Sequence, residues 1–192
     1  MIDKFCDKVS NKITSNILPN ETELISFGLY HFIMYSFLVF TICFIGILTK
    51  TIISITIFLL ILIPFRRYIG GFHFNNRLLC LFSSIAISLF PIIICQININ
   101  QHYLGFFCLL FYMPTLFFSI LEHPNKPIST DEKELYKLKA TKIKYVILLT
   151  SFIFSTFNNP YTKIIYMSMT TASTLLYLGI FQNYIFSKSE RA

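Results

Sequence analysis

A histidine and a cysteine that stand seven residues apart, His73 and Cys80, are the side chains of this chain best suited to chemistry. An imidazole that accepts the proton of a thiol produces a thiolate, which is the nucleophile of cysteine-dependent acyl transfer. Both residues lie in a polar segment, 66–80, between two long apolar runs, and the segment also contains the pair Gly70-Gly71. The segment therefore predicts a cysteine nucleophile that a histidine base activates.

The spacing of the pair sets a condition on the backbone. On one straight helix, His73 and Cys80 would stand about 10.5 Å apart along the axis. Proton transfer needs a separation of about 3 Å or one bridging water. The Gly70-Gly71 pair allows a break in the helix, and we therefore expect His73 to lie on a loop that folds back towards Cys80.

A new helix is expected to begin shortly before Cys80. Asn75 or Asn76 is a suitable N-cap for it, and both the helix N-terminus and Arg77 would favour the thiolate. The alternative interpretation is a cysteine that only packs and a histidine that lies at the level of the lipid headgroups.

The other histidine–cysteine pairs are weaker candidates. His31 and Cys43 lie on one apolar run at a spacing that prevents contact. Cys95 and Cys108 flank His102 near the expected outer face, without the arginines and the double glycine of segment 66–80. Of these pairs, His102 and Cys108 compete best.

The sequence lacks the motifs of several other chemistries. It contains no HExxH, no GxSxG and no CxxC pair, so we expect no metal, no cofactor and free thiols. No apolar run contains an acidic residue of the kind that marks an ion or proton path, which argues against a transporter.

The composition predicts an all-α integral membrane protein. Of the 192 residues, 55% are hydrophobic and only 13% charged, whereas soluble domains have about 25% charged residues. A soluble core of this size could not enclose 22 Phe and 11 Tyr besides the Ile and Leu runs. The net charge of +7 is attributed to membrane topology rather than to a nucleic-acid partner. We expect one membrane-embedded domain over 1–192.

Apolar runs of about 20 residues predict about six transmembrane helices. The runs are residues 24–49, 51–65, 78–99, 103–121, 145–161 and 164–186. The second run ends at Pro64-Phe65 and is short enough to be re-entrant. If all six span the bilayer and both termini are cytoplasmic, 14 of the 16 basic residues lie inside, as the positive-inside rule requires. His73 and Cys80 then lie at the cytoplasmic boundary.

The expected domain has four parts. They are an amphipathic helix at 1–22, spans one to four at 24–121 with the catalytic segment 66–80, a basic cytoplasmic loop at 122–144, and spans five and six at 145–186. The first helix has a lysine-rich face and is expected to lie on the inner leaflet, which is compatible with a simple basic anchor. The loop is expected to start a charged helix near residue 131. Its lysines have two interpretations: they set topology and contact headgroups, or they bind an acidic peptide.

The chain resembles the accessory gene regulator protein B family, bacterial membrane cysteine endopeptidases that mature the cyclic autoinducer peptide of a quorum-sensing system. The residues that carry the resemblance are Arg66-Arg67, Gly70-Gly71-Phe72-His73, Cys80 and Asn125-Lys126-Pro127. Size, span count and the basic N-terminal helix are similar too, so the resemblance covers nearly the whole chain. Phe74 departs from the small residue that such proteins often have after the histidine, which concerns pocket shape and substrate identity.

The resemblance implies that Cys80 attacks a peptide bond of a short membrane-bound precursor and releases its acidic C-terminal tail. The rest of the precursor remains as a thioester, which an internal cysteine or serine converts to a thiolactone or lactone. His73 is assigned as the general base and later the acid, without an identified third residue that orients it. Residues expected to bind the tail or shape the site are Arg66, Arg67, Gly70, Gly71, Arg77 and Lys126.

The further expectations are a bacterial cell membrane location, a precursor peptide and the lipid bilayer as partners, and, by analogy, a homodimer. A function from another class stays open: a non-catalytic membrane peptide exporter or scaffold, whose histidine and cysteine are structural.

Overall fold

All regular elements in the described part of the chain are helices. The computed structural model describes residues 8–9, 11, 22–72, 77–97, 99–118, 120–121, 130–157 and 159–189. The helices are α2 (Thr22–Leu48), α3 (Ile52–Ile69), α4 (Arg77–Ser88), α5 (Phe90–Gln96), α6 (Gln101–Tyr112), the 3₁₀ helix η2 (Met113–Leu116), α7 (Thr130–Thr156) and α8 (Thr162–Ser189). Apart from residues 8–9 and 11, which are helical, the expected helix at 1–22 lies outside the described residues.

Four helical segments among the described residues are long and apolar enough to cross a membrane. They are Ile25–Leu48, Ile52–Ile69, Leu79–Gln96 and Thr162–Ile185. This finding confirms the prediction of an all-α membrane protein. The count of six spans and the cytoplasmic placement of both termini stay predictions.

The chain divides into two compact units, Met1–Ile45 and Gly46–Ala192. The described part of the first unit is mainly α2, whose phenylalanines are exposed on many sides, among them Phe32 at 69% and Phe40 at 70%. A helix that is apolar all round is typical of a lipid-facing span. All predicted site residues fall in the second unit.

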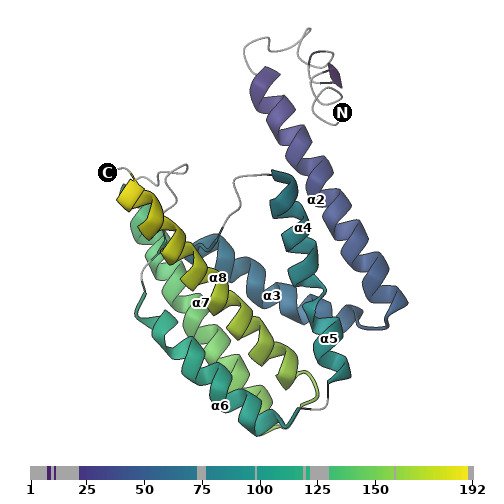
Figure 1. Ribbon diagram of the computed structural model, residues 1–192, viewed down its shortest axis with the longest axis vertical. Helices are drawn as coiled ribbons and strands as arrows, with labels where there is room; N and C mark the ends of the chain where they lie inside the picture. Colours follow the sequence, from purple (N-terminus) through teal and green to yellow (C-terminus); the bar gives the residue numbers. More distant parts are fainter. Residues whose placement is uncertain are drawn as a thin grey trace. The chain divides into compact units, whose positions relative to one another are not determined.

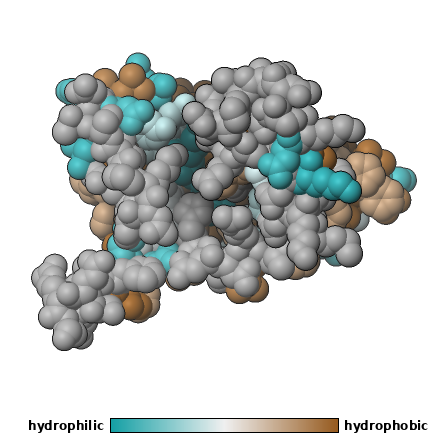
Figure 2. Space-filling view, turned by 90° about the horizontal axis from the view of Figure 1, so that it is seen from above, coloured by the Kyte–Doolittle hydropathy of each residue, from teal (hydrophilic) through white to brown (hydrophobic). Residues whose placement is uncertain are grey.

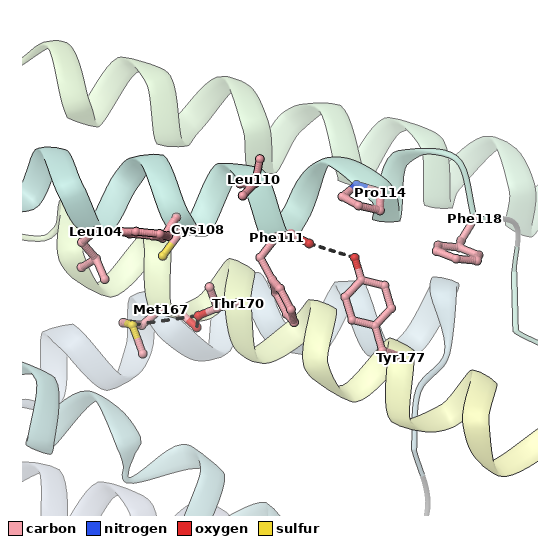
Figure 3. A pocket seen from close by; sticks show the side chains of 10 residues that line it. Leu104, Cys108, Leu110, Phe111, Pro114, Phe118, Met167, Thr170 and Tyr177 are labelled. Atoms are coloured by element: carbon pink, nitrogen blue, oxygen red, sulfur yellow. Dashed lines mark hydrogen bonds between the residues drawn. The ribbon is translucent and has the colours of Figure 1, made fainter.

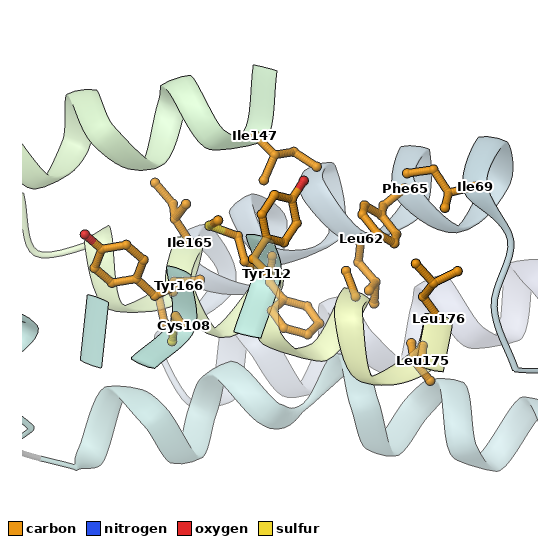
Figure 4. Close-up of a cluster of buried hydrophobic side chains, with 14 of the residues drawn as sticks. Leu62, Phe65, Ile69, Cys108, Tyr112, Ile147, Ile165, Tyr166, Leu175 and Leu176 are labelled. Carbon is orange, nitrogen blue, oxygen red and sulfur yellow. The ribbon is translucent and has the colours of Figure 1, made fainter. Parts of the chain in front are cut away.

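Helix α8 lies at the centre of the second unit. It packs against α3, α6 and α7, and Figure 1 shows α6, α7 and α8 alongside one another. Its buried face includes the small residues Ala172 and Ser173, which let neighbouring helices approach closely. Figure 4 shows how Leu176 of α8 meets Phe65 of α3 in the buried cluster, which also contains Tyr112 of α6. The end of α3 is therefore held by the protein core.

The structure corrects the expected end of the second apolar run. Helix α3 continues through Pro64 and both arginines to Ile69. A proline removes only one helix hydrogen bond, and membrane helices tolerate that loss. The helix ends instead at Gly70, whose φ of 94° a helix cannot accommodate. Its 18 residues span about 27 Å, close to the hydrocarbon thickness of about 30 Å.

Two other runs also differ from single straight helices. The run 78–99 contains both α4 and α5, which Leu89 separates. The run 103–121 is interrupted because α6 ends at Tyr112 and a 3₁₀ turn follows at Met113-Pro114. The 12 residues of α6 extend only about 18 Å, so this run is not one straight span. In contrast, α7 is continuous from 130 to 156 and joins the charged helix expected near residue 131 to the apolar run that follows it.

Candidate active site

Cys80 lies in the first turn of α4, as the sequence predicts. Its side chain is half-buried and its thiol is free. The hydroxyls of Ser83 and Ser84 donate to the Cys80 carbonyl at 3.0 and 2.8 Å, so both serines bond backbone rather than the sulfur.

His73 lies outside the described residues, as do Asn75, Asn76 and Lys126. The contact between His73 and Cys80 therefore stays a prediction. The described backbone does include the glycine break before the histidine, because α3 ends at Ile69 and residues 70–72 are not helical.

The first residue of this break is one that only glycine can occupy. Gly70 has φ 94° and ψ −167°, a combination that is essentially restricted to glycine. A Cβ at this position would also lie 2.8 Å from the carbonyl oxygen of Leu121. The Gly70 amide donates to the Arg66 carbonyl at 3.2 Å and closes the end of α3. This amide is therefore used within the fold.

Phe72, which directly precedes His73 in the chain, is held at both of its backbone polar groups. Its N–H donates to the carbonyl of Leu175 on α8 at 2.9 Å. Its carbonyl accepts from Nη2 of Arg66 at 3.0 Å. One hydrogen bond thus holds the peptide unit before Phe72, and the other holds the peptide unit that joins Phe72 to His73.

The contact with Phe72 gives Arg66 a structural role that the sequence did not suggest. Arg66 was expected to bind the acidic tail of a substrate, but its guanidinium is half-buried and bonds the turn. A charged donor strengthens this hydrogen bond beyond that of a neutral pair. The spacing alone indicates that this contact is feasible, because a long side chain one turn before a helix end can reach the residues that follow the helix.

Arg67 has different surroundings. It is exposed, and its guanidinium carbon lies 5.7 Å from the ring centroid of Tyr68. The Nζ atom of Lys139 on α7 lies 5.3 Å from the same centroid, and the ring of Tyr136 lies 5.5 Å away. These four residues form a cationic–aromatic patch that joins the end of α3 to the start of α7. Figure 2 shows that hydrophilic residues form separate patches on this face of the molecule, with hydrophobic residues beside some of them.

Arg77 is the first residue of α4, and its side chain is outside the described set. Lys144, expected on the surface of the basic loop, is instead buried, with 4% of its side chain exposed. Its Nζ donates to the carbonyl of Phe118, and its own carbonyl accepts from the Tyr112 hydroxyl at 3.1 Å. Lys144 therefore ties the end of the α6 segment to α7 and is not part of a peptide-binding surface.

The competing pair of His102 and Cys108 does not form a site. The two residues are six positions apart on α6, which separates them by about 9 Å along the axis. His102 is exposed and its amide bonds the Asn100 side chain at 3.0 Å, whereas Cys108 is 2% exposed. Among the described residues, no group of three or more His, Cys, Asp or Glu side chains is placed to hold a metal ion.

An open apolar groove of about 760 Å³ lies between α6 and α8. Figure 3 shows the residues that line it, with the Tyr177 hydroxyl donating to the Phe111 carbonyl at 2.8 Å. None of the predicted site residues lines this groove. It is therefore distinct from the segment that contains Cys80.

These features define an all-α membrane protein that has a free thiol in the first turn of α4 and, at the end of α3, a turn that the protein core holds in place. The chain belongs to the accessory gene regulator B (AgrB) family, whose pattern matches residues 3–181. The match includes the whole of segment 66–80 and confirms the resemblance seen in the sequence. Family membership places the protein in the accessory gene regulator system of quorum sensing. Neither a curated protein nor a solved structure matches the chain.

Proposed function

We propose that the protein is a membrane cysteine endopeptidase that cleaves a short precursor peptide and closes its ring. The observation that carries the proposal is the half-buried free thiol of Cys80 in the first turn of α4. The turn Gly70–Phe72 supports it, since its contacts direct the chain into His73 from a fixed backbone. The family match supports the same assignment.

In the first step, His73 accepts the proton of the Cys80 thiol and the sulfur attacks the scissile carbonyl carbon. The tetrahedral intermediate collapses when the protonated imidazole donates to the leaving amine. The tail of the precursor departs with a free amino group, and the remaining part is bound to Cys80 as a thioester.

In the second step, a thiol or hydroxyl within the bound precursor attacks the thioester carbonyl. His73 accepts its proton, the carbon–sulfur bond to Cys80 breaks, and the cysteine thiolate recovers a proton from the imidazole. Exchange between two thioesters is nearly balanced in free energy, so water must be excluded for ring closure to compete with hydrolysis. A thiol at the boundary of an apolar helix suits that requirement.

We assign binding of the acidic tail to cationic side chains at the end of α3 and on α7. Arg67 and Lys139 are exposed and belong to the patch between α3 and α7. Arg77 and Lys126 are further candidates by position in the sequence. Cations at a membrane surface attract an acidic peptide over about a Debye length, so the affinity for the tail should fall with rising salt concentration.

Single replacements test the proposal in membranes that contain the precursor. Cys80→Ala and His73→Ala should both abolish cleavage, and the parent protein should form a precursor adduct on Cys80 that hydroxylamine releases. Cys43→Ala is the matched control, because Cys43 is an exposed free thiol on α2. Full cleavage by the Cys80→Ala protein would show that the exporter or scaffold hypothesis is the better one.

A further inference from the structure

Gly179 lies where α8 meets the turn that precedes His73. A Cβ built on Gly179 would lie 2.6 Å from Cδ2 of Leu121, 2.7 Å from the carbonyl carbon of Gly71 and 2.9 Å from the amide nitrogen of Phe72. Two of these three atoms are backbone, so a change of side-chain rotamer cannot relieve the clash. The absence of a side chain at 179 is thus a requirement of the contact between α8 and the turn.

The hydrogen bond from Phe72 to α8 explains why the approach is so close. Its acceptor is the carbonyl of Leu175, four residues before Gly179. Within a helix this carbonyl also faces the N–H of residue 179, and residues 175 and 179 share a face. A side chain at 179 would cover the carbonyl that Phe72 must reach. Glycine inside a helix is less favourable than alanine, and this contact explains why glycine is nevertheless present.

Leu121 contacts both the turn and α8. Its N–H donates to the carbonyl of Ile69 at 2.8 Å, and its side chain lies beside Gly179. The turn therefore packs against Leu121 as well as against α8. The hydrogen bonds of Ile69 and Phe72 fix it at both ends.

We propose that Gly179 is a positioning residue for His73. It seats the turn on α8 and thereby fixes the backbone at Phe72, the residue that directly precedes His73. The inference rests on the proposed function, in which His73 is the general base. It adds that the C-terminal helix, far from the motif in sequence, positions the turn that leads into this base.

The size of the effect follows from the clash. The distance of 2.7 Å to Gly71 is 0.7 Å shorter than the 3.4 Å at which ordinary contacts begin. In Gly179→Ala the turn must therefore move by about this amount or more. A misplacement of about 1 Å reduces catalysis by about 100-fold, so we expect kcat to fall by about 10- to 100-fold while KM changes little.

The experiment uses the full-length chain in lipid vesicles, with Cys80 as the single remaining cysteine. Gly179→Ala and Leu121→Ala are compared with the parent, with His73→Ala, and with Gly28→Ala as control. A Cβ at Gly28 would meet nothing within 4 Å. For each protein, kcat and KM of precursor cleavage are measured, together with the pH dependence of Cys80 alkylation by iodoacetamide.

We expect the alkylation profile of Gly179→Ala to shift towards that of His73→Ala, because the displaced imidazole no longer pairs with the thiol. If Gly179 served only to stabilise the fold, its replacement would leave the pH profile of Cys80 alkylation unchanged. Leu121→Ala adds no atoms and loosens the turn by removing the side chain that lies beside Gly179, so it tests the proposal if Gly179→Ala fails to insert. Parental kcat and a parental profile in either inserted variant would overturn the proposal. Full activity of His73→Ala would instead refute the proposed function itself, and the inference with it.

Discussion

The two adjacent arginines at the end of α3 offer a sharp test of how the catalytic turn is held. Arg66 donates to the Phe72 carbonyl at 3.0 Å and is half-buried, whereas Arg67 is exposed and lies against the Tyr68 ring. Glutamine at position 66 or 67 removes the same charge from neighbouring residues. The pair of variants therefore separates positioning of the turn from attraction of an acidic tail.

The expected magnitudes follow from the two contacts. A hydrogen bond to a charged donor contributes about 1.5–3 kcal/mol, so its loss reduces the population of the correctly oriented turn by about 10- to 150-fold. This loss should appear in kcat, since the turn leads into His73. Arg67 is exposed, and an exposed ion pair between it and the acidic tail would contribute about 0.2–1 kcal/mol. For Arg67→Gln we therefore expect a change of about 1.4- to 5-fold, in KM rather than kcat.

The assay is the initial rate of precursor cleavage in vesicles at several substrate and salt concentrations. Arg66→Lys should recover only part of the activity, because an ammonium group lacks the planar geometry of the guanidinium. The salt dependence of KM should weaken in Arg67→Gln and stay unchanged in Arg66→Gln. A raised KM with parental kcat in Arg66→Gln would refute the reasoning, since Arg66 would then bind the tail rather than the turn.

Three further predictions concern the fold around the site. Gly70→Ala places a Cβ in a glycine-only region of backbone angles and 2.8 Å from the Leu121 carbonyl oxygen. It should lower stability by about 1–3 kcal/mol and kcat with it; unchanged thermal unfolding and kcat would contradict this. Tyr112→Phe removes the buried hydroxyl that bonds the Lys144 carbonyl, so the unfolding free energy in detergent should fall by about 1 kcal/mol with kcat retained. Gly105→Ala builds a Cβ 2.8 Å from a buried aromatic ring of α8 and should reduce the unfolding temperature; a stabilised protein would show that the α6–α8 contact is looser than described.

Patterns in the sequence predicted the helices better than their ends. The apolar runs located most helices correctly, because hydropathy along the chain decides what a bilayer accepts. Helix α3 extends beyond its apolar run to Ile69, because hydropathy marks the limit of the apolar stretch and not the end of the helix. The interruption of the run 103–121 at Met113-Pro114 was missed. Hydropathy does not register a local break.

The sequence by itself determined the all-α membrane class, the family, and the start of a helix just before Cys80, since composition, periodicity and caps are local properties. Only the tertiary structure decided what the polar residues do. Arg66 bonds the turn, and Lys144 is buried. Gly179 lies against the backbone of the same turn, which is more than 100 residues earlier in the chain. Contacts of this kind depend on which helix faces pack together, and no local pattern encodes a close approach between segments so distant in sequence.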